Sequence, residues 1–158
     1  FYIARLSEDR LDVDSAVAFV RAPIEGGAIV RHDGLYYCIG SQLTGWWPNA
    51  NKFATAPRLD GPWSGFRDFA PPETHTWGSQ STNLLKITGT ETTSIIYIGD
   101  IWHPYDLSDS RYLLYPLEIG GGELRLKPVG WQPGPWSIDT VTGRITYHQP
   151  NHTPLPNL

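Results

Sequence analysis

The sequence predicts an all-β domain, and three observations point to that class. Short runs rich in β-branched and aromatic residues follow one another along the 158-residue chain, separated by turns of Gly, Pro and Asp. Almost no segment favours a helix. The tripeptide Gly-Pro-Trp occurs at 61–63 and again at 134–136, which favours a repeated unit. A sandwich, a barrel or a propeller satisfies these patterns, and the spacing of the strands favours the propeller.

The first expected elements are two strands and a hairpin. Residues 1–6 form a predicted strand, and residues 11–20 fit either a short strand or one helical turn. Residues 28–39 are expected to form a hairpin, because Asp33-Gly34 supplies the positive φ angles that a tight turn requires. This hairpin would place an apolar strand directly after the segment Glu25-Gly26-Gly27.

The rest of the chain continues the same pattern. Residues 52–56 are expected to form a strand, followed by a turn at 60–62. Three further hairpins are predicted, over residues 81–102, 110–131 and 136–148. No linker interrupts this series, so the propeller domain is expected to cover residues 1–147. The proline-rich segment 148–158 is expected to form an irregular tail.

Composition excludes several classes of function. A net charge of −4 without a long basic block argues against nucleic acids and anionic membranes as partners. No apolar run approaches the roughly 18 residues of a membrane span, and no signal peptide is visible. Cys38, the single cysteine, is expected in the core. The histidines are scattered and no phosphate or dinucleotide motif occurs, so we expect no metal ion and no cofactor.

Polar residues next to Gly and Trp mark the expected strand ends. Each can be explained as turn chemistry, and Trp46 as a core residue. In a propeller, however, strand ends on one face converge at the central axis. A carboxylate, an amide, hydroxyls and Trp rings would then line one pocket suited to a sugar. These candidates are Glu25, Thr44, Trp46, Gln80, Asp100 and Trp102.

Three segments together resemble a known family. They are residues 25–63, which contain Thr-Gly-Trp-Trp-Pro-Asn, residues 77–82, which read Trp-Gly-Ser-Gln-Ser-Thr, and residues 97–119. In this order they are similar to glycoside hydrolase family 43, in particular its exo-β-1,3-galactanase branch. The resemblance runs from about Tyr2 to about Trp136. It implies a five-bladed β-propeller with its active site at the axis, of which about three blades are expected here.

The resemblance also implies roles for the candidate residues. Glu25 occupies the position of the general acid, although Glu-Gly-Gly stands here where members usually have Glu-Ala-Pro. We expect it to be partly buried among glycines and aromatic rings. Gln80 matches a glutamine proposed to position the attacking water in the galactanase branch, and Thr44 matches a contact of the terminal sugar. Trp46 is expected to hold the sugar, and Asp100 and Trp102 match a motif near the site.

The predicted function is hydrolysis of β-1,3-linked galactan from the non-reducing end, with a polysaccharide or oligosaccharide as the partner. Polymeric substrates of this kind imply an extracellular protein. We expect the chain to be part of a catalytic domain, and its activity in isolation stays open. Two alternatives also stay open: a non-catalytic carbohydrate-binding propeller fragment, and an arabinanase or xylosidase of the same family. The sequence makes no prediction of the oligomeric state.

Overall fold

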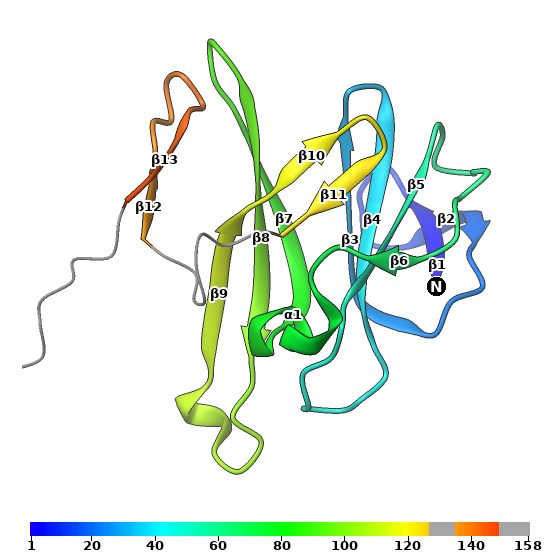
Figure 1. The fold of residues 1–158 in the computed structure, drawn as a ribbon. Coiled ribbons are helices and arrows are strands. Elements are labelled where there is room, and N and C mark those ends of the chain that lie inside the picture. Colours follow the sequence, from blue (N-terminus) through cyan, green and yellow to red (C-terminus); the bar gives the residue numbers. More distant parts are fainter. Residues whose placement is uncertain (127–134, 149–158) are drawn as a thin grey trace, which may run out of the picture.

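The computed structural model describes residues 1–126 and 135–148, which consist mainly of β-strands (Figure 1). The described strands form five antiparallel sheets: one of four strands, one of three, and three two-stranded hairpins. The predicted all-β class is therefore confirmed. Within these ranges no helix is long and apolar enough to cross a membrane. The predicted tail at 148–158 lies outside the described residues except for His148.

The larger sheet grows from a hairpin that the sequence predicted. In spatial order it contains β3 (Ile24–His32), β4 (Leu35–Gln42), β5 (Lys52–Ala56) and β6 (Arg67–Asp68). The turn at Asp33-Gly34 has φ angles of 45° and 81°, as a tight hairpin turn requires. Because β3 begins at Ile24 rather than at residue 28, Glu25 lies within the strand and pairs with Ser41.

The second sheet confirms one predicted hairpin and corrects another. It contains β7 (Gln80–Thr88), β8 (Thr93–Ile101) and β9 (Arg111–Pro116). The predicted hairpin 110–131 is wrong in its first strand, because residues 111–116 form β9, which pairs with β8. This pairing lets Leu113 and Tyr115 alternate into the core, and burial of that apolar surface outweighs a local hairpin.

Three small hairpins complete the described strands. They are β1 (Tyr2–Leu6) with β2 (Val13–Phe19), β10 (Glu118–Gly120) with β11 (Glu123–Arg125), and β12 (Trp136–Ile138) with β13 (Ile145–Tyr147). Residues 11–20 thus contain a strand rather than a helical turn. The third predicted hairpin is reduced to β10 and β11, and its expected residues 127–131 lie outside the described ranges.

The helical segments are short. They are η1 (Pro72–Thr74), α1 (His75–Gly78) and η2 (Leu107–Asp109). All four residues of α1 have positive φ angles, between 48° and 72°, so this turn is left-handed. Such a conformation is costly for L-residues and especially for a β-branched one such as Thr76. It leads directly into β7.

One hydrophobic cluster joins the two larger sheets. Its fully buried members from the first sheet include Tyr37, Ile39 and Phe53, and those from the second include Ile95 and Tyr97. Cys38 is buried beside this cluster on β4 as predicted. Burial raises the pKa of its thiol from 9.0 to about 12.

The two larger sheets meet along β3 and β7 as neighbouring blades of a propeller do. Ser81 Oγ donates to Gly26 O over 3.0 Å, and Lys86 Nζ donates to Arg31 O over 3.0 Å. Both contacts join residues 55 positions apart, so the strands run parallel. In Figure 1 the β3–β4 turn and the β7–β8 turn both lie at the upper end, and β3 and β7 both begin at the lower end. The first residues of both strands therefore lie together.

Candidate functional site

A cavity of about 400 Å³ lies at the start of β3 and β7. Five of the six predicted site residues line it: Glu25, Trp46, Gln80, Asp100 and Trp102. The other lining residues are small or hydroxylated: Gly26, Gly27, Ser41, Gly45, Ser81 and Thr82. The cavity thus combines two carboxylates, one amide, several hydroxyls and two indole rings, which is the chemistry that a sugar requires.

Both inner strands carry a β-bulge at the cavity. In β3 the register shifts between Glu25 and Ala28, and in β7 it shifts between Ser81 and Asn83. A bulge bends its strand and re-aims the neighbouring side chains, which is why bulges are common next to active sites. Here the bulges follow Glu25 and Gln80 within two residues.

The glycines after Glu25 allow close packing around the acid. Gly26 has a φ of +58°, and a Cβ there would lie 2.1 Å from Ser81 O. A Cβ on Gly27 would lie 2.3 Å from the ring of Phe1. Any larger residue would therefore push β3 away from β7 or from the N-terminal segment. The Glu-Gly-Gly sequence brings the acid next to the second sheet.

Glu25 itself is more open than predicted. Its residue is exposed, so the expected partial burial is wrong for the described chain. The two residues that follow it, Gly26 and Gly27, have no side chain with which to cover it. Among the described residues none hydrogen-bonds to its carboxyl group, whereas its backbone oxygen accepts from Ser41 Oγ over 3.4 Å. The carboxyl group is available to a ligand.

The Gln80 amide is held in one orientation. Its Nε2 lies 2.7 Å from Gly45 O, 2.6 Å from Trp47 O and 3.3 Å from Thr44 Oγ1. Because the two nearest partners are carbonyl oxygens, only the NH2 end of the amide can face them. Gln80 is only 7% exposed, and its Oε1 has no hydrogen-bond partner among the described residues. The amide therefore offers an acceptor, not a donor, to a bound molecule.

Thr44 is the predicted site residue that does not line the cavity. Its hydroxyl donates to Trp47 O over 2.5 Å and accepts from Asn49 Nδ2 over 2.8 Å. It also lies against Gln80, as described above. In this structure Thr44 shapes the loop that holds Gln80.

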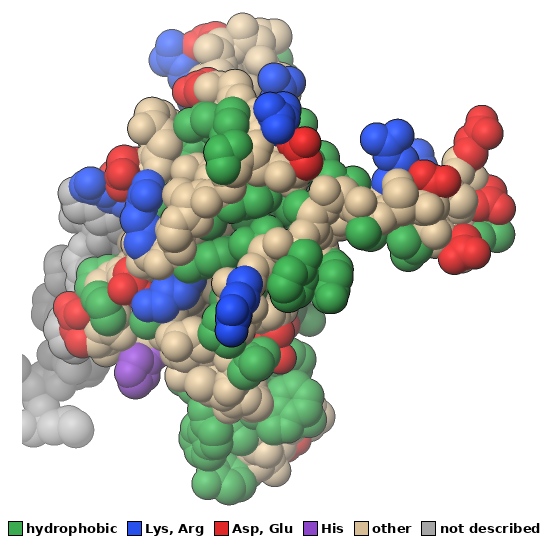
Figure 2. All heavy atoms as spheres, turned by 90° about the vertical axis from the view of Figure 1, so that its right-hand side faces the viewer, with side chains coloured by type: hydrophobic (Ala, Val, Ile, Leu, Met, Phe, Trp, Pro, Cys, Tyr) green, Lys and Arg blue, Asp and Glu red, His purple; other side chains and the backbone are tan. Residues whose placement is uncertain are grey.

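Two tryptophans form an aromatic wall. Trp46 and Trp102 pack edge to face with ring centroids 4.8 Å apart, and Trp46 is 48% exposed. Neither is a core residue, which removes the alternative reading of Trp46. Figure 2 shows hydrophobic side chains gathered at the lower end of the molecule, where loops 43–51 and 102–110 lie in Figure 1. These loops carry the exposed residues Leu43, Trp46, Trp47, Tyr105 and Leu107.

Asp100 lies opposite Gln80 in the β7–β8 register. Its Oδ2 accepts a hydrogen bond from Thr82 Oγ1 over 2.7 Å, and both residues line the cavity. On the same strand as Asp100, Tyr97 is fully buried, and its hydroxyl shares a 2.9 Å hydrogen bond with Ser79 Oγ. Burial raises the pKa of Tyr97, and the nearby charge of Asp100 acts in the same direction. Tyr97 is therefore a neutral structural phenol.

The described residues contain no group of three or more His, Cys, Asp and Glu side chains placed to hold a metal ion. The carboxylates of the cavity, Glu25 and Asp100, come from different sheets.

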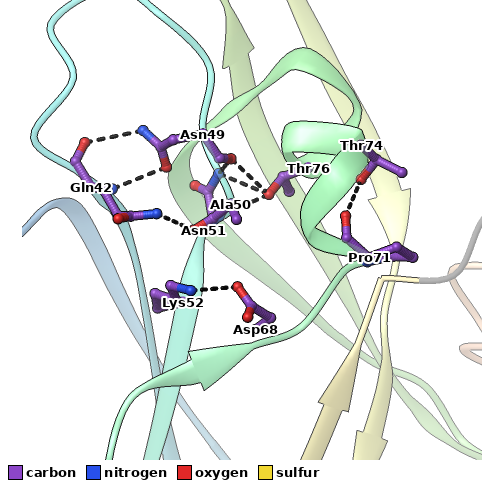
Figure 3. A network of polar contacts seen from close by, with 9 residues as sticks. All are labelled: Gln42, Asn49, Ala50, Asn51, Lys52, Asp68, Pro71, Thr74 and Thr76. Carbon is purple, nitrogen blue, oxygen red and sulfur yellow. Dashed lines mark hydrogen bonds and ion pairs between the residues drawn. The ribbon is translucent and has the colours of Figure 1, made fainter.

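Asn51 and Thr76 are buried polar residues that the sequence reasoning missed. Figure 3 shows them in a network that also contains Asn49 and Gln42. Asn51 and Thr76 are 1% and 0% exposed. The available signal was the segment Asn49-Ala50-Asn51, which places two amides at the start of an otherwise apolar strand.

Comparisons with known proteins identify relatives of this fold. No family model matches the chain, and no curated protein matches it. Among solved structures, exo-β-1,3-galactanase from Phanerochaete chrysosporium with galactose is 36% identical, with a TM-score of 0.83, over 94% of this chain and 33% of the other. A variant of that enzyme was solved with β-1,3-galactotriose. An exo-β-1,3-galactanase from Clostridium thermocellum is 29% identical, with a TM-score of 0.81, over 96% of this chain and 33% of the other.

This chain therefore spans about a third of the length of the galactanases that it matches. The match covers nearly all of the present chain, so the sheets around the cavity correspond to part of a larger propeller. The resemblance inferred from the sequence is confirmed. The chain is a partial five-bladed β-propeller, similar to the exo-β-1,3-galactanases of glycoside hydrolase family 43.

Proposed function

We propose that this chain forms part of the catalytic cavity of a glycosidase that cleaves β-1,3-linked galactan from its non-reducing end. One observation supports this most directly. Glu25 and Gln80 line the same cavity, and each presents an oxygen atom that has no partner among the described residues. A proton donor and a water acceptor are the two groups that hydrolysis of a glycosidic bond requires.

Glu25 is the proposed general acid. Cleavage of a glycosidic bond leaves negative charge on the departing oxygen, and protonation of that oxygen removes the charge. The Glu25 carboxyl group is exposed to the cavity and free of protein hydrogen bonds among the described residues. It can therefore approach the glycosidic oxygen without first breaking a hydrogen bond.

Gln80 is the proposed partner of the attacking water. Its NH2 group is bound to the 44–47 loop, which leaves Oε1 to accept a hydrogen bond from water. A water held in this way keeps a lone pair directed at the anomeric carbon. Positioning of a reactant can account for a large part of a rate enhancement.

Two parts of the cavity are the proposed sugar-binding surfaces: the aromatic wall, and the side that carries Thr82 and Asp100. The indole rings of Trp46 and Trp102 offer flat apolar surfaces to the C–H face of a pyranose. Asp100, already oriented by Thr82, can accept from sugar hydroxyls. Thr44 acts through Gln80, because its hydroxyl lies against that amide.

Galactan is the proposed substrate class. The matched P. chrysosporium enzyme holds galactose in one structure and β-1,3-galactotriose in another. This favours galactan over arabinan or xylan, and analysis of products from a panel of the three polymers discriminates among them. A polymeric substrate of this kind also favours an extracellular location.

The first prediction tests Glu25. Glu25→Gln in the full-length protein keeps the size of the side chain and removes the proton. We expect galactose release from β-1,3-galactan to fall by a factor on the order of 10² to 10⁴, the usual contribution of a general acid. An aryl galactoside with a good leaving group, which needs little protonation, should lose much less.

Glu118→Gln serves as the control, because Glu118 is exposed on β10 outside the cavity lining. It should retain wild-type rates on both substrates. Undiminished galactan hydrolysis by Glu25→Gln would remove Glu25 from the acid role.

A non-catalytic galactan-binding module is the second candidate, favoured by the exposed Trp46 ring, which lines the cavity beside Trp102. Titration of the protein with β-1,3-galactotriose, followed by analysis of the mixture for free galactose, separates the two. Binding without galactose release would favour the module.

A further inference from the structure

The side chain of Asn51 forms hydrogen bonds with the backbone on both sides of Gln80. Its Nδ2 donates to Ser79 O over 2.8 Å, and its Oδ1 accepts from Ser81 N over 2.6 Å. One side-chain amide thus forms the hydrogen bonds of the two peptide groups that flank Gln80. In a sheet, the backbone of a neighbouring strand would form these bonds. Asn51 is 1% exposed, so water does not compete for these hydrogen bonds.

Asn51 also holds the left-handed turn that precedes Gln80. Thr76 Oγ1 accepts from Asn51 N and from Asn51 Nδ2, both over 2.9 Å, and donates to Asn49 O over 3.1 Å. The turn is costly by itself, as shown above, so these contacts are what keep it in place. Its geometry sets the direction in which the chain enters β7.

Asn49 fixes the other contact surface of Gln80. Asn49 Nδ2 donates to Gln42 O over 3.1 Å and to Thr44 Oγ1 over 2.8 Å, and Asn49 Oδ1 accepts from Gln42 N over 3.0 Å. These bonds hold the 44–47 loop, whose oxygen atoms receive the Gln80 amide. Asn49 and Asn51, which Figure 3 shows in one network, therefore orient both the side chain and the backbone of Gln80.

We propose that Asn51 is a positioning residue for Gln80. It does not line the cavity, and it acts by holding the Ser79 and Ser81 peptide groups so that Gln80 Oε1 meets the attacking water. This inference rests on the proposed role of Gln80. It assigns a task to a buried residue that touches no substrate.

Asn51→Asp is the first test, because the substitution keeps the shape and the acceptor for Ser81 N but removes the donor to Ser79 O. In the full-length protein we expect kcat on β-1,3-galactotriose to fall by a factor on the order of 10², the effect of a small misplacement of a reacting group. KM should change little, since the sugar-binding side chains are untouched.

Tyr37→Phe is the matched control for lost stability. Tyr37 is fully buried on β4, the strand that pairs with β5 directly after Asn51, and its hydroxyl accepts from Gly122 N over 3.0 Å, away from the cavity. It should lower Tm without lowering kcat. An equal loss of kcat in Tyr37→Phe and Asn51→Asp, at matched Tm, would overturn the proposal.

A double-mutant cycle isolates the coupling to Gln80. If Asn51 acts through Gln80, Asn51→Asp should cause no further loss of kcat in a Gln80→Ala background. The same loss in both backgrounds would refute the positioning role while the role of Gln80 stands. Full activity of Gln80→Ala alone would instead refute the proposed function.

Should Asn51→Asp not fold, Thr76 provides a second pair of variants. Thr76→Ser keeps the hydroxyl that binds Asn51, and Thr76→Val removes it at nearly constant volume. We expect Thr76→Val to lose kcat in the same way and Thr76→Ser to retain it. Equal kcat in the two variants would contradict the proposal.

Discussion

At the scale of single residues, the cavity distinguishes an amide from a carboxylate at position 80. The Nε2 group of Gln80 lies within 2.7 Å of two backbone carbonyl oxygens, those of Gly45 and Trp47. A carboxylate at this position would place a negatively charged oxygen atom against these carbonyl oxygens, and the contact would be repulsive. The surrounding backbone therefore selects glutamine, although a carboxylate of Asp or Glu is the usual base in glycoside hydrolysis.

Gln80→Glu tests this selection. We expect kcat to fall by a factor on the order of 10². The free energy of unfolding should fall by about 1 kcal/mol, because the partly buried hydrogen bonds from Gln80 to Gly45 O and Trp47 O are lost. Steady-state kinetics on β-1,3-galactotriose and urea unfolding measure the two effects. A variant as active as the wild type would show that a carboxylate serves the water equally well and that the amide orientation is unimportant.

At the scale of elements, the site depends on the contact between β3 and β7. Their parallel alignment brings the bulges of both strands to the cavity. Gly26 is the point of closest approach, because its missing Cβ leaves room for Ser81 O. The two sheets, and hence Glu25 and Gln80, can only meet if this position stays small.

Gly26→Ala should therefore destabilise the protein by more than about 2 kcal/mol, from the cost of positive φ together with the clash. Gly121→Ala is a close control, since Gly121 also has a φ of +58° but nothing within 4 Å of its Cβ position. It should show only the conformational cost, about 1 kcal/mol. Thermal unfolding of both variants measures the difference, and equal losses would mean that the strands tolerate the methyl group.

At the scale of the whole molecule, the free energy of unfolding depends on pH in the alkaline range, because Cys38 is buried beside the core that joins the two sheets. The Cys38 thiol in an unfolded chain ionises near pH 9, whereas in the fold its pKa is about 12. Between these values the unfolded state has lost a proton that the folded state retains. Stability therefore decreases as pH rises from about 9 to about 12, by up to about 1.4 kcal/mol per pH unit.

Cys38→Ala should remove this part of the alkaline slope when urea unfolding is followed from pH 8 to pH 11. Ile39→Val, which trims a neighbouring buried side chain without changing any ionisable group, should keep the wild-type slope. Identical slopes for all three proteins would show that the thiol does not ionise differently in the two states.

The sequence by itself determined the strands, the Asp33-Gly34 turn and the family, because alternation, turn chemistry and short motifs are local properties of the chain. It also singled out Glu25 and Gln80. Only the tertiary structure decided that β9 joins β8 and that His75–Gly78 turns left-handed. Only it decided that Asn51 holds the chain around Gln80. These features depend on burial and on hydrogen bonds between distant residues, whose combined free energy outweighs local preference.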